Sequence, residues 1–154
     1  MSDLSKLCIH SITTKPLGLR EAAGKYASAG VSAISVWQDA VAAYGENHKA
    51  TGEMIRSEGI DVACYVRGGF FTALEGSGRL KAIDENKRII DESAEIGAPL
   101  VVLVCGATPG QSLFESRKQI TEGIAESVKH AAAAGIKLGI EPLHPMYADS
   151  RSAV

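Results

Sequence analysis

Four helical segments of this chain each end in a glycine that leads directly into an apolar run. The glycines are Gly30, Gly59, Gly97 and Gly135. Glycine just past a helix end adopts the left-handed backbone conformation at little cost, so each one predicts a helix end. The apolar runs predict strands, and a further run precedes them all: Leu7–Ile12, Ala33–Trp37, Ile60–Val66, Leu100–Cys105 and the strand that ends at Glu141.

The segments between these strands have the period of amphipathic helices. Two apolar stripes recur every three to four residues, one made of Leu19, Ala22, Ala23, Tyr26 and Ala27, the other of Ile120, Ile124, Val128, Ala131 and Ala132. Strands that alternate with helices are joined by crossover connections, which predicts a parallel sheet in an α/β fold.

The last strand favours a barrel over an open sheet. A doubly wound sheet carries helices on both faces, so its strands are apolar on both sides. Alternation in the last strand instead separates an apolar face from a polar one: Ile136, Leu138 and Ile140 against Lys137, Gly139 and Glu141. A barrel covers only its outer face with helices and places chemistry inside, toward the C-terminal ends of its strands.

The length sets the extent of that barrel. A (β/α)8 barrel of the TIM type needs about 250 residues, whereas this chain has 154. We therefore expect residues 1–154 to be the N-terminal portion of a single domain, an incomplete barrel of about five strands and four helices. A five-stranded flavodoxin-like domain would need a covering helix after the last strand, where Pro142 and Pro145 predict a loop.

Composition limits the classes of partner. The formal net charge is −2, and no basic cluster is present that would attract a nucleic-acid backbone. No segment is apolar and long enough to suggest a membrane span, and the N-terminus lacks the pattern of a signal peptide. The three cysteines, Cys8, Cys64 and Cys105, are scattered over the strands and are expected to be buried, reduced thiols, which suits a cytoplasmic protein.

The run Leu138–Tyr147, which reads Leu-Gly-Ile-Glu-Pro-Leu-His-Pro-Met-Tyr, resembles the fifth-strand signature of the xylose isomerase-like TIM-barrel family of sugar phosphate isomerases and epimerases. The resemblance extends over essentially the whole chain. Its supporting stretches are 34–37 on the second strand, 84–88 and 94–98 around the third helix, and 101–106 with Pro109-Gly110 on the fourth strand.

That resemblance implies a divalent metal bound by Glu141, with Asp, His and Glu ligands from strands six to eight, which lie outside this chain. Glu141 would be both the catalytic carboxylate and a metal ligand. Oxygen ligands suit Mn²⁺ or Mg²⁺, Co²⁺ and Zn²⁺ are alternatives, and no nucleotide cofactor is expected. The position alone, at the end of a barrel strand, also allows a simpler role for Glu141 as a cap or ion-pair partner of the loop.

The same family contains apurinic endonuclease-like members, which bind several zinc ions through further histidines after strands three and four. Here those places are occupied by Tyr65–Gly69 and Cys105–Gly110, and neither stretch contains a histidine. This departure, together with the lack of basic charge, argues against a DNA-repair enzyme.

Three further residues are candidate substrate contacts. His10 falls on the inner face of the first strand if Leu7 and Ile9 face the helices, and plain packing is an equal alternative. Trp37, at the end of the second strand, is placed to stack on a sugar ring or to close the top of the barrel. His144, three residues past Glu141, is expected to hydrogen-bond a substrate oxygen.

Three charged or titratable residues point more weakly to function. Arg67 has the bidentate fork that would hold an anionic group, but a surface ion pair is the preferred interpretation. His48 and His130 lie on predicted helices and are expected to be solvated.

The chemistry implied for the complete protein is proton transfer next to a carbonyl through an enediolate, on a small sugar or sugar phosphate. Isomerisation and epimerisation both follow from it, and the 154-residue chain alone is expected to be inactive. The alternatives are an inosose-type dehydratase of the same family and a non-catalytic sugar-binding fragment. The first and last strands would be unpaired edges, so we expect self-association into a homo-oligomer.

Overall fold

The computed structural model describes residues 4–148 and 150–154. Five strands form one sheet in the order β1-β2-β3-β4-β5, with β1 (Cys8–His10), β2 (Ala33–Trp37), β3 (Asp61–Gly69), β4 (Leu100–Val104) and β5 (Lys137–Ile140). The pairs β1–β2 and β2–β3 are parallel, and the register of β2–β3 shifts by one residue between Ile34 and Ser35. No pairing joins β1 to β5 among these residues, so the sheet is open. The expected parallel sheet of an incomplete barrel is confirmed.

The helices differ from expectation in one connection. Helices α1 (Leu19–Ser28), α4 (Gly76–Ile96) and α5 (Leu113–Ala134) lie where they were predicted, but the segment between β2 and β3 holds two helices, α2 (Gln38–Tyr44) and α3 (His48–Ser57). Gly45, with φ of 84°, ends α2, and the Asn47 side chain accepts a hydrogen bond from the Ala50 amide at the start of α3. The prediction of about four helices therefore becomes five, because these two local signals divide the segment.

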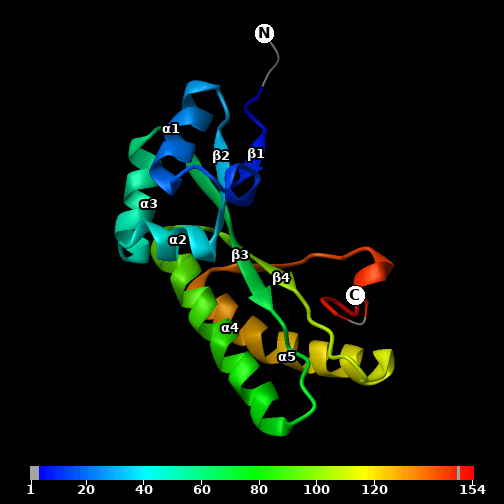
Figure 1. The fold of residues 1–154 in the computed structure, drawn as a ribbon. Helices are drawn as coiled ribbons and strands as arrows, with labels where there is room; N and C mark the ends of the chain where they lie inside the picture. Colours follow the sequence, from blue (N-terminus) through cyan, green and yellow to red (C-terminus); the bar gives the residue numbers. More distant parts are fainter. Residues whose placement is uncertain (1–3, 149) are drawn as a thin grey trace. The chain divides into compact units, whose positions relative to one another are not determined.

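One compact unit comprises residues 4–66 and Glu92–Leu100. Helix α1 buries Leu19, Ala22, Ala23 and Tyr26, four of the five residues of its predicted stripe. Ile34 and Val36 are fully buried in β2. Figure 1 shows α1, α2 and α3 gathered beside β1 and β2.

The other unit comprises Arg67–Asp91 and Val101–Val154. In α5 the predicted stripe is partly wrong, because Val128 is 47% exposed although Ile120 and Ala131 are buried. The buried face of α5 is made largely of small and polar residues, including Gly123 and Ser127. A Cβ on Gly123 would lie 2.3 Å from Phe71 Cδ1, so the helix approaches the segment after β3 along its least bulky side.

The cysteines only partly follow the prediction of burial. Cys105 is buried and Cys64 half-buried, but Cys8 is exposed, since β1 lies at the end of the sheet and one side of it is uncovered. All three thiols are free.

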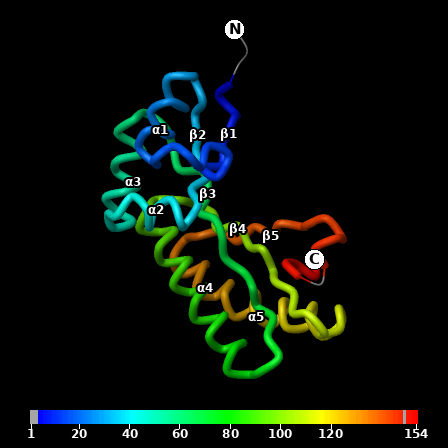
Figure 2. The backbone as a smooth tube through the Cα atoms, viewed as in Figure 1, coloured from blue at the N-terminus to red at the C-terminus, as the bar shows by residue number. Residues whose placement is uncertain are grey.

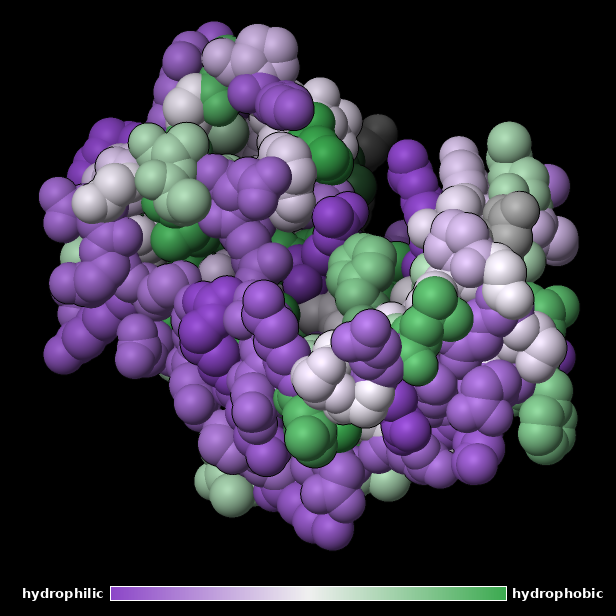
Figure 3. All heavy atoms as spheres, turned by 60° about the horizontal axis from the view of Figure 1, so that its bottom comes forward, coloured by the Kyte–Doolittle hydropathy of each residue, from purple (hydrophilic) through white to green (hydrophobic). Residues whose placement is uncertain are grey.

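Exposed hydrophobic residues are scattered among hydrophilic ones on the face shown in Figure 3. Within the described part of the chain, none of the helices combines the length and hydropathy needed to cross a bilayer.

Candidate active site

Glu141 directly follows β5. Its backbone amide donates a hydrogen bond of 3.0 Å to the Leu103 carbonyl oxygen of β4, which holds the residue at the C-terminal end of the strand. The residue is exposed, and no side chain among residues 4–148 and 150–154 pairs with its carboxylate. The alternative role in a loop cap or ion pair therefore finds no partner there.

His144 lies in the same unit and caps the short 3-10 helix η2 (Pro145–Tyr147). Its Nδ1 accepts a hydrogen bond of 3.2 Å from the Met146 amide. An accepting Nδ1 carries no proton, so the neutral ring carries its proton on Nε2. The exposed imidazole thus keeps one donor, Nε2–H, for a ligand oxygen.

The loop that contains Glu141 and His144 is held in place by hydrogen bonds at its C-terminal end. Ser152 forms a parallel bridge with Gly106, and the Ala153 amide donates to the Gly106 carbonyl oxygen at 3.0 Å. Arg117 Nε donates to the Ala153 carbonyl oxygen at 2.9 Å, and Ser152 and Ala153 are both buried. Figure 2 shows this C-terminal segment returning beside the residues that follow β4. The two prolines predicted the loop, but no residue pattern marked its anchor.

Phe70, just after β3, was not identified from the sequence. Its φ of 54° is unusual for a bulky residue, and its ring is partly exposed. The neighbouring backbones leave little room, because a Cβ on Gly69 would lie 2.0 Å from the Val104 oxygen and a Cβ on Gly106 would lie 2.8 Å from Phe70 Cα. The expected ion pair of Arg67 is wrong: its guanidinium carbon lies 4.9 Å from the Phe70 ring centroid, and no described carboxylate pairs with it.

His10 and Trp37 belong to the other unit. His10 is half-buried at the end of β1, and its Nδ1–H donates to the Ser35 carbonyl oxygen at 3.1 Å. The Cys64 thiol donates to the Ser35 hydroxyl at 3.0 Å, so β1, β2 and β3 present a polar cluster where the inner face was predicted.

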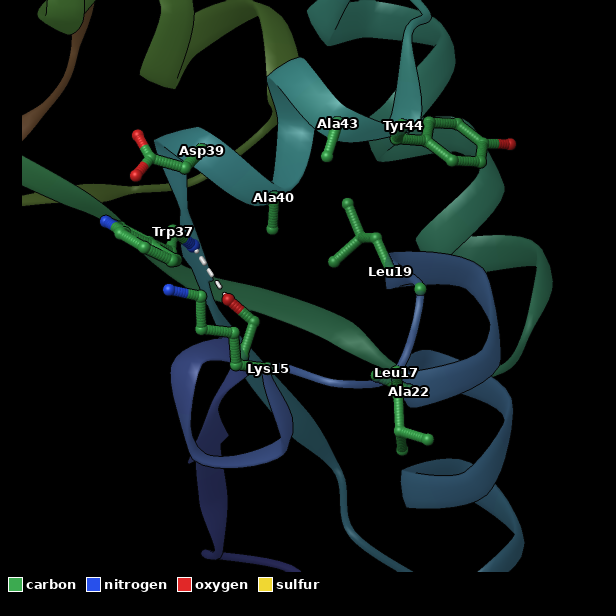
Figure 4. A pocket seen from close by; sticks show the side chains of 11 residues that line it. Lys15, Leu17, Leu19, Ala22, Trp37, Asp39, Ala40, Ala43 and Tyr44 are labelled. Carbon is green, nitrogen blue, oxygen red and sulfur yellow. Dashed lines mark hydrogen bonds between the residues drawn. The ribbon is translucent and has the colours of Figure 1, made fainter.

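Trp37 lines a pocket of about 430 Å³ that His10 does not reach. The Trp37 amide donates to Ser11 Oγ at 2.9 Å, and Lys15 Nζ lies 5.3 Å from the centroid of the Trp37 ring (Figure 4). The two candidate contacts of this unit therefore lie in different surroundings, one in a polar cluster and one in a pocket.

The predicted solvation of His48 is wrong, whereas His130 stays partly exposed. His48 is half-buried: its Nε2 lies 3.1 Å from the Tyr65 hydroxyl and 3.7 Å from a Glu92 oxygen, because α3 packs on β3 and the end of α4. His130 bonds Asp91 on α4 through Nε2, at 2.7 Å.

A divalent metal does not fit this chain alone. Within the described ranges no three His, Cys, Asp or Glu side chains converge in a way that would hold a metal ion. Glu141 offers carboxylate oxygens, which suit a hard cation, but one residue does not make a coordination shell.

Comparisons with known proteins agree with the fold. The model of the family described as "Xylose isomerase-like TIM barrel" matches residues 23–152. A crystal structure of a protein from Sinorhizobium meliloti 1021 is 45% identical, with a TM-score of 0.89 over 96% of this chain and 54% of that one. No curated protein sequence matches significantly.

Two more distant structures share the fold. The IolI protein, solved with a zinc atom, is 20% identical, with a TM-score of 0.74 over 86% of this chain and 50% of that one. D-psicose 3-epimerase from Clostridium cellulolyticum H10, solved with D-tagatose, is 13% identical, with a TM-score of 0.75 over 89% and 52%. The chain thus spans about half the length of these solved structures.

Proposed function

Because the chain belongs to the xylose isomerase-like TIM-barrel family, we propose that it supplies the catalytic carboxylate, Glu141, of a sugar or sugar phosphate isomerase or epimerase. Residues 1–154 would form the N-terminal portion of the single barrel domain. The observation that carries the proposal is the position of Glu141, held at the end of β5 by Leu103 with its carboxylate exposed. Barrels of this type build their active sites at that end of the strands.

In this proposal the Glu141 carboxylate takes the proton from the carbon next to the substrate carbonyl. Return of that proton to the former carbonyl carbon, with transfer of a proton between the two oxygens of the enediolate, gives isomerisation. Protonation of the original carbon on its opposite face by a second group gives epimerisation. His144 contributes its Nε2–H to a substrate oxygen and acts mainly on affinity. His10 and Trp37 stay predictions as substrate contacts.

We further propose that the complete barrel binds one divalent metal, Mn²⁺ or Mg²⁺ ahead of Co²⁺ or Zn²⁺, with Glu141 as one of several ligands. The zinc atom in the IolI structure supports a metal in a protein of this fold. A bound metal would polarise substrate oxygens. The 154-residue chain alone should bind these ions no better than an ordinary surface carboxylate does, and calorimetric titration tests this.

The reaction is tested by incubating the complete barrel with ketoses and ketose phosphates in deuterated water. Isomerase or epimerase chemistry incorporates deuterium at the carbon next to the carbonyl and gives an isomeric product, seen by NMR and mass spectrometry. A product that has lost water would replace this proposal with a dehydratase. Saturable binding of sugar without deuterium exchange would replace it with a non-catalytic binding role.

A further inference from the structure

The pocket beside Trp37 is enclosed by the 3-10 helix η1 (Ser11–Thr14) with the turn after it, by α1 and by α2. Its volume of about 430 Å³ lies within the range of small-molecule sites. Two hydrogen bonds between elements fix its walls. The Trp37 amide donates to Ser11 Oγ at 2.9 Å, and Arg20 Nη2 donates to the Tyr44 hydroxyl at 3.1 Å. The pocket is therefore preformed in one unit of the chain.

The interior of this pocket is unsuited to a polyol. Five of its eleven lining residues are aliphatic: Leu17, Leu19, Ala22, Ala40 and Ala43. Its two hydroxyl groups, on Ser11 and Tyr44, each accept a hydrogen bond from the protein and keep one O–H donor. A sugar placed there would meet few polar partners along the aliphatic part of the wall, and each hydroxyl buried without a partner costs free energy. An apolar body fits better, and the flat indole of Trp37 suits an aromatic ring.

Lys15 lies at the end of the pocket that Trp37 forms. Lys15 Nζ stands over the Trp37 ring, and no described carboxylate forms an ion pair with this exposed ammonium group. Asp39 is the acidic residue in the lining, and Figure 4 shows its carboxylate directed away from the cavity that Ala40 and Leu19 face. An anionic group on the ligand would therefore meet Lys15 at the rim.

We propose that this pocket binds a small aromatic carboxylate, with its ring against Trp37 and the aliphatic wall and its carboxylate at Lys15. The inference uses only residues of one unit and is independent of Glu141 and of the sugar chemistry proposed above. In this proposal Trp37 contacts an aromatic ligand and not an uncharged sugar.

Trp37 is the single tryptophan of the sequence, so tryptophan emission of the 154-residue chain reports on this pocket. Benzoate is the probe, benzyl alcohol its uncharged analogue, and D-fructose 6-phosphate a sugar that carries negative charge. We expect benzoate to change the emission saturably and to bind more tightly than benzyl alcohol. A sugar phosphate that bound more tightly than benzoate would overturn the proposal and place Trp37 in a sugar site.

Substitutions of Lys15 and Ala40 test the cationic group and the cavity of the pocket separately. Lys15→Met should weaken benzoate binding about two- to five-fold, the range of an exposed ion pair, and leave benzyl alcohol binding unchanged. Lys25→Met is the matched control, because Lys25 is exposed on α1, pairs with Glu21 and lies outside the lining. Equal benzoate binding by both variants would contradict the role of Lys15.

Ala40→Leu should fill the cavity and abolish the response to benzoate and benzyl alcohol alike, with an unchanged circular dichroism spectrum as the check on folding. An undiminished response in this folded variant, or no saturable response in the unsubstituted chain, would overturn the proposal.

Discussion

The backbone amide of Glu141 lies 3.0 Å from the carbonyl oxygen of Leu103 and donates a hydrogen bond to it. This hydrogen bond extends the pairing of β5 with β4 by one residue past the end of β5. The Glu141 carboxylate therefore lies at the junction between the strand and the following loop. Main-chain pairing, rather than a side-chain partner, fixes the position of the residue. A substitution that keeps the shape of the side chain should therefore leave the position unchanged.

Asn86 of α4 is expected to be a main stabilising residue of its unit. Its Oδ1 accepts from the Gly69 amide at 2.6 Å, and its Nδ2 donates to the Gly69 carbonyl oxygen at 2.7 Å, both in a buried setting. Asn86→Ala would leave both groups of Gly69 unsatisfied and should lower the free energy of unfolding by about 1–3 kcal/mol in urea denaturation. Lys87→Ala, a surface change on the same helix, is the control, and equal losses for the two variants would contradict this role.

Gly52 allows α3 to approach the end of α4 closely. A Cβ at this position would lie 2.1 Å from the Ile96 carbonyl oxygen, which is backbone and cannot move aside easily. Gly52→Ala should therefore destabilise the chain by about 1–3 kcal/mol, although alanine is favoured in helices by about 1 kcal/mol. At Gly24 of α1 the nearest atom is the flexible Glu58 carboxylate, at 3.2 Å. Gly24→Ala should be tolerated, and a thermal melt that ranks the two variants the other way would refute the packing argument.

The three cysteines should differ in reactivity. Burial raises the pKa of the Cys105 thiol to about 11, so almost no thiolate forms there at mildly alkaline pH. Partial burial, and secondarily Cys64, also raises the pKa of Cys8, but Cys8 is exposed. Iodoacetamide should therefore label Cys8 before Cys105, as followed by peptide mass spectrometry. Equal labelling rates in the folded chain would contradict this order.

The raised pKa of Cys105 has a consequence for stability as well. Its folded-state pKa of about 11 lies above the ordinary value of 9.0. Between these values the unfolded chain loses the thiol proton more readily than the folded chain does. The free energy of unfolding that this proton contributes is therefore fully present below pH 9 and is lost as the pH rises through 11. Cys105→Ala should reduce this alkaline loss in denaturation curves measured across that interval.

Strand β5 is expected to promote self-association. It is the last strand of the sheet, and Ile140 at its end is 51% exposed. Exposed edges and apolar side chains favour pairing between copies. Ile140→Lys should shift the light-scattering mass of the 154-residue chain toward the monomer. A monomer already present before substitution would show that this edge does not associate.

Much of the fold was predictable because its signals are local. Gly30, Gly59, Gly97 and Gly135 all have positive φ, between 71° and 86°, which confirms them as helix ends. The buried face of α5 was not predictable in the same way, because it depends on the close approach of Gly123 to Phe71. Helix period alone ranks the larger Val128 as buried, and tertiary packing decides otherwise.

In the candidate site, too, features set by local sequence were predictable and features set by contacts between distant residues were not. The position of Glu141 follows from strand alternation and the proline after it, both of which are local. Phe70, in its left-handed conformation, lies close to the backbone of Gly106, which comes 36 residues later in the chain, so its own sequence neighbourhood does not reveal its surroundings. The half-buried setting of His48 likewise arises from Tyr65 and Glu92, which its own helix pattern does not reveal.

The central claim, that Glu141 is the catalytic carboxylate, is tested most directly by Glu141→Gln in the complete barrel, assayed by deuterium exchange next to the carbonyl of its sugar substrate. Glutamine preserves size and the backbone contact with Leu103 but removes the charge and basicity, so exchange should fall by about 10²–10⁴-fold at unchanged thermal stability. Glu126→Gln, which alters an exposed carboxylate of α5 that pairs with Lys129, should leave exchange unchanged. Near-normal exchange in the Glu141→Gln enzyme would show that this residue is structural and would contradict the proposed function.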